Sequence, residues 1–197
     1  MEEQEYLMKA HVVLKKLLKE FDRVCQEYNI QYYVICGSLL GAVRHQDLIP
    51  WDDDVDVALT RENYNKLLSA ADKEWRKGDF CWVKYDELGQ GVFLDFMNRL
   101  VFLREEIPVN IFNKIKGKGR QDIQNHLAID IYVLDNACDN LRKHNVQTKT
   151  IMGLYGLAMG HRAYINYEEY SDKDKKTQTI IKVLSTMGKA IPLKFIF

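Results

Sequence analysis

The sequence carries no net charge, and this lack excludes the simplest electrostatic partners. Its 197 residues include 28 Lys and Arg and 28 Asp and Glu, so the formal net charge is zero. A protein that binds nucleic acid or an acidic membrane through its overall field usually has a surplus of basic residues. We therefore predict no nucleic-acid partner, and we expect any functional charge to be local.

Closely spaced cysteines are lacking too. The chain has no Cys-x-x-Cys pair and no Cys/His spacing typical of a zinc site, and its four cysteines are far apart: Cys25, Cys36, Cys81 and Cys138. This usage favours a reducing, cytoplasmic location.

Long apolar runs are missing as well. No stretch reaches the roughly 20 apolar residues that span a bilayer, so we expect no transmembrane segment. The start of the chain, Met1 followed by EEQEY, lacks the basic and apolar regions of a secretory signal. The apolar stretch 151–159 is too short to cross a membrane, and we expect it to be a core helix.

The apolar residues that are present follow clear periods. They make up 47% of the chain, enough for a sizeable core. A 3.6-residue period predicts an amphipathic helix over 3–28 and a second over about 61–76, where Thr60 is the expected cap. Everything after Asn140 reads as helical. Strand-like runs occupy residues 31–36, 55–59, 81–85, 91–96, 99–103 and 126–134.

This order of elements predicts an α/β (α+β) fold in a single domain, 1–197. Its core, residues 1–138, would be a mixed β-sheet flanked by helices. Residues 139–197 would form a helical C-terminal part.

Four carboxylates lie immediately before and within the strand-like run at 55–59: Asp52, Asp53, Asp54 and Asp56. Residues two apart on a strand point to the same face, so Asp54 and Asp56 should project together. Two adjacent carboxylates repel each other unless a cation lies between them. Mg²⁺ typically binds through one or two carboxylates plus substrate phosphates.

Asp130 and a Gly-Ser turn complete the pattern. Asp130 lies in the apolar run AIDIY, where it must face something polar because an unpaired buried charge is costly. Gly37 and Ser38 close a strand and open a short helix that Ser38 can cap, and helix N-termini attract phosphate. The combination predicts a phosphate cradle beside a three-carboxylate metal site, which suits a two-metal displacement at phosphorus.

A plainer interpretation stays open for each group. The run from Asp52 to Asp56 could be a solvated turn, and Asp130 could cap a helix or pair with an arginine.

The segment GSLLGAVRHQDLIPWDDDVDVALTRENY, residues 37–64, resembles the signature of the LicD family in the nucleotidyltransferase fold superfamily. AIDIYVLD, residues 128–135, is similar to a later strand of that family. The resemblance implies a bacterial phosphotransferase that moves a phospho-alcohol, typically phosphocholine from CDP-choline, onto a sugar hydroxyl, and CMP leaves. The acceptor would be a cell-surface glycan such as lipopolysaccharide, teichoic acid or capsule. Relatives in the wider family handle CDP-ribitol.

The resemblance also assigns the metal residues. The family's metal carboxylates fall on Asp54 and Asp56, and its third acidic residue falls on Asp130. They would hold Mg²⁺ or Mn²⁺, with two ions expected. Asp130 would complete the second metal site or accept the proton of the attacking hydroxyl.

The phosphate-binding residues follow in the same way. Gly37 and Ser38 match the phosphate-contacting turn, and Arg44 and His45 match the basic pair after the short helix. Arg44 would act in catalysis by neutralising charge on the phosphate oxygens. The alternatives are a structural salt bridge from Arg44 to a neighbouring aspartate and a helix-capping role for His45. Trp51 is expected to pack under the site rather than to stack on cytosine.

Two hypotheses from other classes remain beside the phosphotransferase. One is a nucleotidyltransferase that moves NMP from an NTP, and the other is an inactive, truncated remnant that still binds nucleotide. Compared with the family, the chain is expected to be short, which predicts a weak or inactive catalyst that still binds metal and nucleotide. Its apolar ending, 191–197, predicts self-association as a homodimer.

A basic loop at 113–121 carries Lys114, Lys116, Lys118 and Arg120. A solvated loop is the favoured interpretation, and a peripheral contact with an anionic glycan or the membrane surface is the alternative. We expect a cytoplasmic location, and the inner face of the membrane is the alternative.

Overall fold

A computed structural model of the chain describes residues 3–76, 78–84, 96–106, 126–162, 165 and 167–196. They belong to two compact units, which are treated separately. The first contains the described residues up to Lys84, from Met97 to 106 and from 126 to Asp135. The second contains Phe96 and the described residues from Asn136 onward. The boundary at 138 expected from the sequence stays a prediction.

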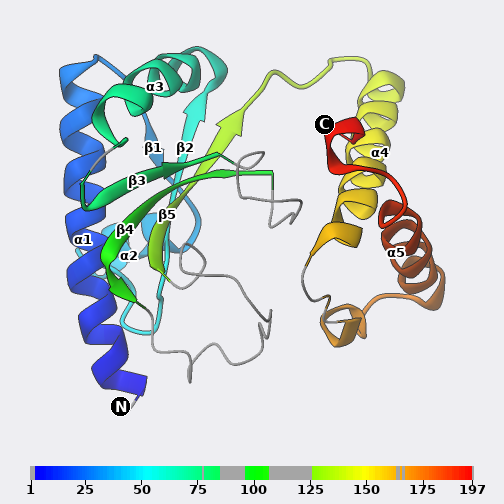
Figure 1. The fold of residues 1–197 in the computed structure, drawn as a ribbon, viewed down its shortest axis with the longest axis horizontal. Helices are drawn as coiled ribbons and strands as arrows, with labels where there is room; N and C mark the ends of the chain where they lie inside the picture. Colours follow the sequence, from blue (N-terminus) through cyan, green and yellow to red (C-terminus); the bar gives the residue numbers. More distant parts are fainter. Residues whose placement is uncertain are drawn as a thin grey trace. The chain divides into compact units, whose positions relative to one another are not determined.

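Within the described residues, the first unit holds a sheet of five strands (Figure 1). In chain order these are β1 (Tyr33–Val34), β2 (Val55–Thr60), β3 (Phe80–Val83), β4 (Asn98–Glu106) and β5 (His126–Leu134). Their order across the sheet is β1-β2-β5-β4-β3. Strands β2 and β5 are parallel, and the other neighbours are antiparallel. The prediction of a mixed sheet flanked by helices is confirmed, whereas the run predicted at 91–96 falls almost entirely outside the described residues.

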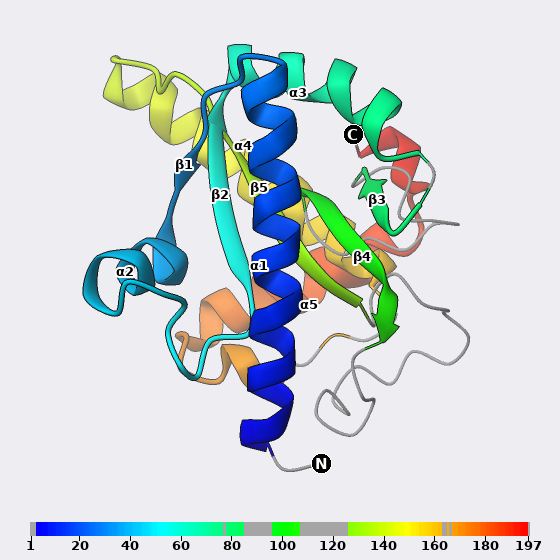
Figure 2. The same ribbon diagram turned by 90° about the vertical axis from the view of Figure 1, so that its left-hand side faces the viewer.

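Three helices belong to the first unit: α1 (Glu3–Glu27), α2 (Cys36–Arg44) and α3 (Arg61–Glu74). Helix α1 runs along one face of the sheet (Figure 2). Its apolar stripe, represented by Leu14 and Leu17, is completely buried in one core cluster with Val57 and Ile131 of the sheet. The 3.6-residue period in the sequence therefore identified the buried side of α1 correctly.

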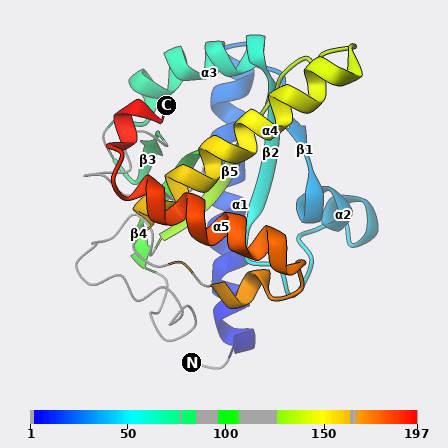
Figure 3. The ribbon, with the colours of Figure 1, turned by 90° about the vertical axis from the view of Figure 1, so that its right-hand side faces the viewer.

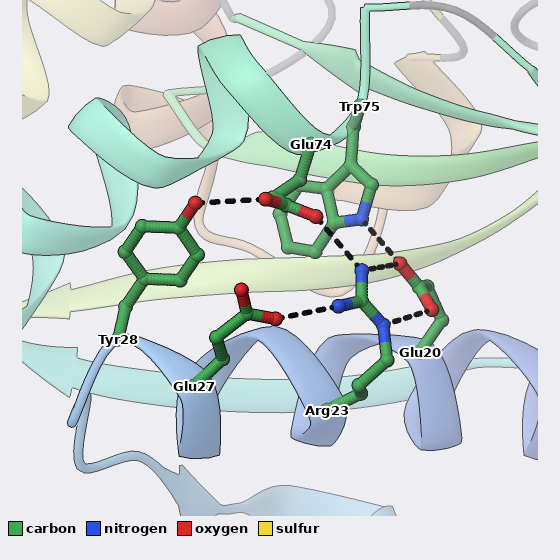
Figure 4. Close-up of polar contacts among 6 residues, drawn as sticks. All are labelled: Glu20, Arg23, Glu27, Tyr28, Glu74 and Trp75. Carbon is green, nitrogen blue, oxygen red and sulfur yellow. Dashed lines mark hydrogen bonds and ion pairs between the residues drawn. The ribbon is translucent and has the colours of Figure 1, made fainter.

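A polar network links α1 to α3 at the edge of this core (Figure 4). The Arg23 guanidinium donates to Glu20 and Glu74 at 2.7–2.9 Å and to Glu27 at 2.8 Å. The indole Nε1 of the buried Trp75 donates to Glu20 Oε1 at 3.0 Å. One guanidinium thus bonds to three carboxylates from two helices.

The second unit is helical, as predicted (Figure 3). It contains α4 (Leu141–Ala158), the 3-10 turn η2 (Met159–His161), η3 (Tyr167–Tyr170), α5 (Lys175–Gly188) and η4 (Leu193–Phe195). Helix α4 begins at Asn140, whose side chain accepts hydrogen bonds from the first-turn backbone, and Asp174 caps α5 in the same way. Where α4 and α5 meet, a Cβ added to Gly188 would overlap the Leu157 carbonyl, so only glycine permits this approach.

The prediction of a core helix over 151–159 is only partly confirmed. Ile151 and Met152 are exposed, by 52% and 66%, whereas Ala158 and Met159 are buried. The apolar ending folds back within the same unit, because Ile196 is buried against Ala158, whereas Phe195 stays 71% exposed. Self-association through this ending remains a prediction. Across the residues that the structure describes, no helix has both the length and the apolar content to traverse a bilayer.

Candidate functional site

Three charged side chains stand in a row on the sheet face opposite α1. The strand register places Asp56 of β2 beside Asp130 of β5, and Asp130 beside Arg99 of β4. Their chain neighbours Val57 and Ile131 are buried in the core under α1. Because side chains alternate along a strand, the charged residues project from the other face.

Asp130 forms a two-pronged ion pair with Arg99. Arg99 Nε donates to Asp130 Oδ1 at 2.6 Å, and Arg99 Nη2 donates to Oδ2 at 3.2 Å. The side chains are only 26% and 18% exposed, so water screens the pair weakly. Of the interpretations open for Asp130, pairing with an arginine is the one that the structure shows. Its role in metal binding remains a prediction.

The aspartates around Asp54 repel one another. Loss of hydration, followed by repulsion from Asp56 and the other nearby carboxylates, raises the pKa of Asp54 to about 7, although the residue keeps an exposed surface. Partial burial and then the charge of Asp130 raise the pKa of Asp56. Burial and the charge of Asp52 raise the pKa of Asp53. The acidic run is therefore more than a freely solvated turn, because its charges are crowded and partly dehydrated.

The candidate metal ligands are two carboxylates rather than a preformed cage. In the described part of the chain, no three or more His, Cys, Asp or Glu side chains are grouped so that they could hold an ion together. No ion pair there joins Asp54 or Asp56 to a basic side chain. Two mutually repelling carboxylates without a basic partner fit a hard divalent cation, which needs only one or two such ligands when phosphate supplies the others. The three-carboxylate, two-ion site stays a prediction.

The Gly-Ser turn packs directly against this acidic run. Helix α2 begins at Cys36 with Ile35 as its N-cap, so the predicted capping by Ser38 is wrong. Ser38 is buried instead, and its Oγ accepts a hydrogen bond of 2.9 Å from the Asp56 backbone N–H. A Cβ on Gly37 would overlap a carboxylate oxygen of Asp52. The turn thus fixes the acidic run, and its contact with phosphate remains a prediction.

Arg44, His45 and Trp51 form a small exposed cluster beside the acidic run. The Arg44 guanidinium lies 5.9 Å from the centre of the Trp51 ring, and the His45 and Trp51 rings meet edge to face at 6.1 Å. Among the described residues, no salt bridge joins Arg44 to Asp52 or Asp53. Trp51 is 69% exposed, so the expectation that it packs under the site is wrong.

Arg99 and His11 were not predicted from the sequence as residues of this site. His11 of α1 hydrogen bonds through Nε2 to the Asp52 backbone carbonyl at 2.8 Å, so α1 holds the acidic run from a distance of 41 positions. Nearby, Lys15 pairs with Asp47 at 2.6 Å. The contacts of Arg99 and His11 follow no local period in the sequence. For Arg99, the only available signal was a basic residue in one predicted strand and a lone aspartate, Asp130, in another.

Comparisons with known proteins converge on one family. The domain family described as LicD/FKTN/FKRP, nucleotidyltransferase domain, matches residues 29–113. The chain is 39% identical over 62 residues to lipopolysaccharide cholinephosphotransferase LicD from Haemophilus influenzae. This alignment covers 32% of the chain and 23% of that protein. The chain is also 36% identical over 78 residues to human ribitol 5-phosphate transferase FKRP. This alignment covers 32% of the chain and 16% of that protein.

The chain therefore spans less than a quarter of the length of these relatives. A solved structure, the small alarmone synthetase 1 from Bacillus subtilis, covers 98% of this chain and 93% of its own at 13% identity, but its TM-score of 0.33 supports no conclusion. The matched segment, 29–113, contains the Gly-Ser turn, the exposed cluster and the acidic run, whereas Asp130 lies beyond it.

Proposed function

We propose that the chain is a member of the LicD family, whose domain model matches residues 29–113, and that it is a phosphotransferase acting on a glycan. The donor would be a CDP-alcohol, such as CDP-choline or CDP-ribitol, and the acceptor a sugar hydroxyl of a cell-surface glycan. The alcohols are suggested by two relatives, which are named a cholinephosphotransferase and a ribitol 5-phosphate transferase.

The observation that carries this proposal is the crowded acidic run at the start of β2. Asp54 has a pKa raised to about 7, and Asp56, whose pKa is also raised, has its backbone fixed by Ser38. Keeping such charges together opposes folding, so a purely structural role does not account for them. Their arrangement inside the segment that matches the LicD domain favours a role in binding a cation and a diphosphate.

Asp54 and Asp56 would hold the divalent cation, Mg²⁺ or Mn²⁺. When bound, that cation supplies positive charge for the phosphate oxygens. Gly37 leaves no side chain between the first turn of α2 and the Asp52 carboxylate, so the acidic run stays close to the turn. The protein's part in the reaction is then to orient the donor phosphate against these carboxylates.

Arg44, His45 and Trp51 would receive the rest of the donor. Arg44 and His45 can donate to phosphate oxygens, as arginines do in phosphoryl transfer. The Arg44 guanidinium already lies over the Trp51 ring. Its positive charge disfavours a second cation, such as choline, on the same ring and favours a neutral nucleobase there. We assign the base of the donor to Trp51.

The transfer itself balances simply. The acceptor oxygen forms a bond to the phosphorus nearer the alcohol, and the bond from that phosphorus to the CMP oxygen breaks. CMP leaves, and the hydroxyl proton passes to a base or to solvent. Attack at the other phosphorus would instead transfer CMP.

A product analysis tests the proposal. The full chain is incubated with Mg²⁺, a glycan acceptor and CDP-choline or CDP-ribitol, and with CTP or ATP in parallel arms. We expect release of CMP that Asp56→Asn abolishes and Asp139→Asn, a change of an exposed aspartate, leaves intact. Pyrophosphate released from CTP or ATP would instead identify a nucleotidyltransferase.

A further inference from the structure

The ion pair of Arg99 with Asp130 has a consequence for the number of cations that the site can hold. Both oxygens of Asp130 face the guanidinium, at 2.6 and 3.2 Å. A metal ion coordinated by the same carboxylate would lie about 2 Å from one of these oxygens. The guanidinium and the ion would then be only a few ångströms apart, where like charges repel strongly.

In the row Arg99, Asp130 and Asp56, the Arg99 guanidinium and a cation bound to Asp56 would lie on opposite sides of Asp130. Asp130 lies between Arg99 on one side and Asp56 on the other, in register on adjacent strands. Arg99 balances Asp130, whereas Asp54 and Asp56 have no ion pair within the described residues. The absence of any preformed group of three or more ligands in that part of the chain agrees with this division.

Conformational freedom does not remove the constraint. Arg99 and Asp130 are both on paired strands, with side chains mostly buried. Withdrawal of the guanidinium would leave Asp130 without its ion-pair partner, in register with Asp56 on the adjacent strand. Breaking such a pair at one partner is more costly than keeping it.

We propose that Arg99 takes the place of a second metal ion, so that this site binds one divalent cation, on Asp54 and Asp56. This inference rests on the proposed function, because it assumes that the acidic run binds a cation. Arg99 is then a positioning residue: it fixes Asp130 and supplies a permanent positive charge beside the donor phosphate, where a two-ion enzyme would use its second metal.

The inference predicts that removal of Arg99 creates a second cation site. In Arg99→Leu, Asp130 keeps its place between the strands but loses its balancing charge, so Asp56 and Asp130 form a new pair of repelling carboxylates. Arg99→Lys keeps the charge and should behave as the parent. Arg61→Leu is the matched control. Arg61 also forms a two-pronged pair, with the exposed Asp135, and this pair lies outside the row of Asp56, Asp130 and Arg99.

The experiment counts bound Mn²⁺ on the full-length chain by the electron paramagnetic resonance signal of the free ion, without nucleotide. We expect one ion on the parent, Arg99→Lys and Arg61→Leu, and two on Arg99→Leu. The melting temperature of Arg99→Leu should also rise more with Mn²⁺ than that of the parent. A merely structural ion pair would lower the melting temperature equally with and without the cation.

Two ions on the parent, or a single ion on a folded Arg99→Leu, would overturn the inference and leave the proposed metal site standing. No ion on the parent would overturn both the inference and the metal-binding part of the proposed function. If Arg99→Leu does not fold, the count on the parent still decides, and the double variant Arg99→Leu with Asp130→Asn, which removes both charges, should fold and bind one ion.

Discussion

Loss of hydration, together with the charges of neighbouring carboxylates, raises the pKa of Asp54. Its pKa of about 7 in the folded protein lies above the ordinary aspartate value of 3.8 that the unfolded chain should show. Between these values the folded state holds a proton that the unfolded state has lost. The stability due to this group is therefore complete below about pH 4 and is lost as the pH rises to about 7.

We predict that Asp54→Asn, which is neutral at every pH, is more stable than the parent near pH 8 in a chelator. The advantage should shrink toward about pH 4, where the parent Asp54 is protonated as well. Melting temperatures measured across this range check the prediction. Asp139→Asn should show no such trend, and an Asp54→Asn advantage that grew on acidification would contradict the assigned cause.

Ser38 provides a second prediction, which concerns fixation of the acidic run. Its buried hydroxyl accepts from the Asp56 N–H at 2.9 Å, and loss of such a bond usually costs about 1 kcal/mol, or up to about 3 if the group left behind is buried. Ser38→Ala should therefore lower the free energy of unfolding in urea by about that amount, whereas the exposed Ser69→Ala should change it little. Equal effects of the two would show that the hydrogen bond to Asp56 contributes nothing.

Single residues were predictable from the sequence where the reason was local. The shared face of Asp54 and Asp56 follows from strand alternation alone. Arg99 and His11 were not predictable, because their partners depend on strand order and on the path of α1 over the sheet. Ser38 was assigned the wrong partner, since a serine near a helix start can bond either to the helix or to a neighbouring strand.

At the scale of elements, the contact of α4 with α5 depends on glycine. A Cβ on Gly188 would meet the Leu157 backbone, which cannot move aside as a flexible side chain could. We predict that Gly188→Ala costs about 1–3 kcal/mol through overpacking. Gly153→Ala, also in this helix pair, meets nothing within 4 Å and should stabilise by up to about 1 kcal/mol because alanine favours helix. Urea unfolding followed by circular dichroism would distinguish the two, and destabilisation by both would contradict this account.

The link between α1 and α3 is electrostatic and should depend on salt. Without Arg23, the carboxylates of Glu20 and Glu74 would face each other without the cation that now bonds to both. Arg23→Ala should lower the melting temperature at low salt, and the loss should diminish at about 1 M salt, where screening acts over about 3 Å. Lys9→Ala, which removes only one exposed pair with Glu5, serves as the control. An equal loss in both variants would show that the network adds nothing beyond ordinary surface pairs.

Helices and strands with a full period were located well from the sequence, within a few residues at each end. Helix α1 was expected at 3–28 and spans Glu3–Glu27, and β5 matches its expected range, 126–134. The start of α2 was harder to locate, because Cys36 reads as the end of a β-prone run. It instead adopts a positive φ of 52° and begins the helix.

At the scale of the whole molecule, a zero net charge conceals a strongly uneven distribution. Acidic residues concentrate at the start of β2, while their balance is spread over the rest of the chain. Composition predicts no nucleic-acid partner but could not identify a partner, and the acidic segment within the family match carries the functional information. The mixed-sheet fold was predictable from the order of elements.

Calorimetric titration of the full chain with CDP-choline tests the central claim most directly, namely that Asp54 and Asp56 bind the donor through a divalent cation. The titration is run in Mg²⁺, in a chelator, and in Mg²⁺ with Asp54→Asn or Asp139→Asn. We predict saturable binding in Mg²⁺ for the parent and for Asp139→Asn, and a loss of binding of at least about tenfold, or 1.4 kcal/mol, in the other two conditions. Binding of equal strength in the chelator, or by Asp54→Asn in Mg²⁺, would contradict the account.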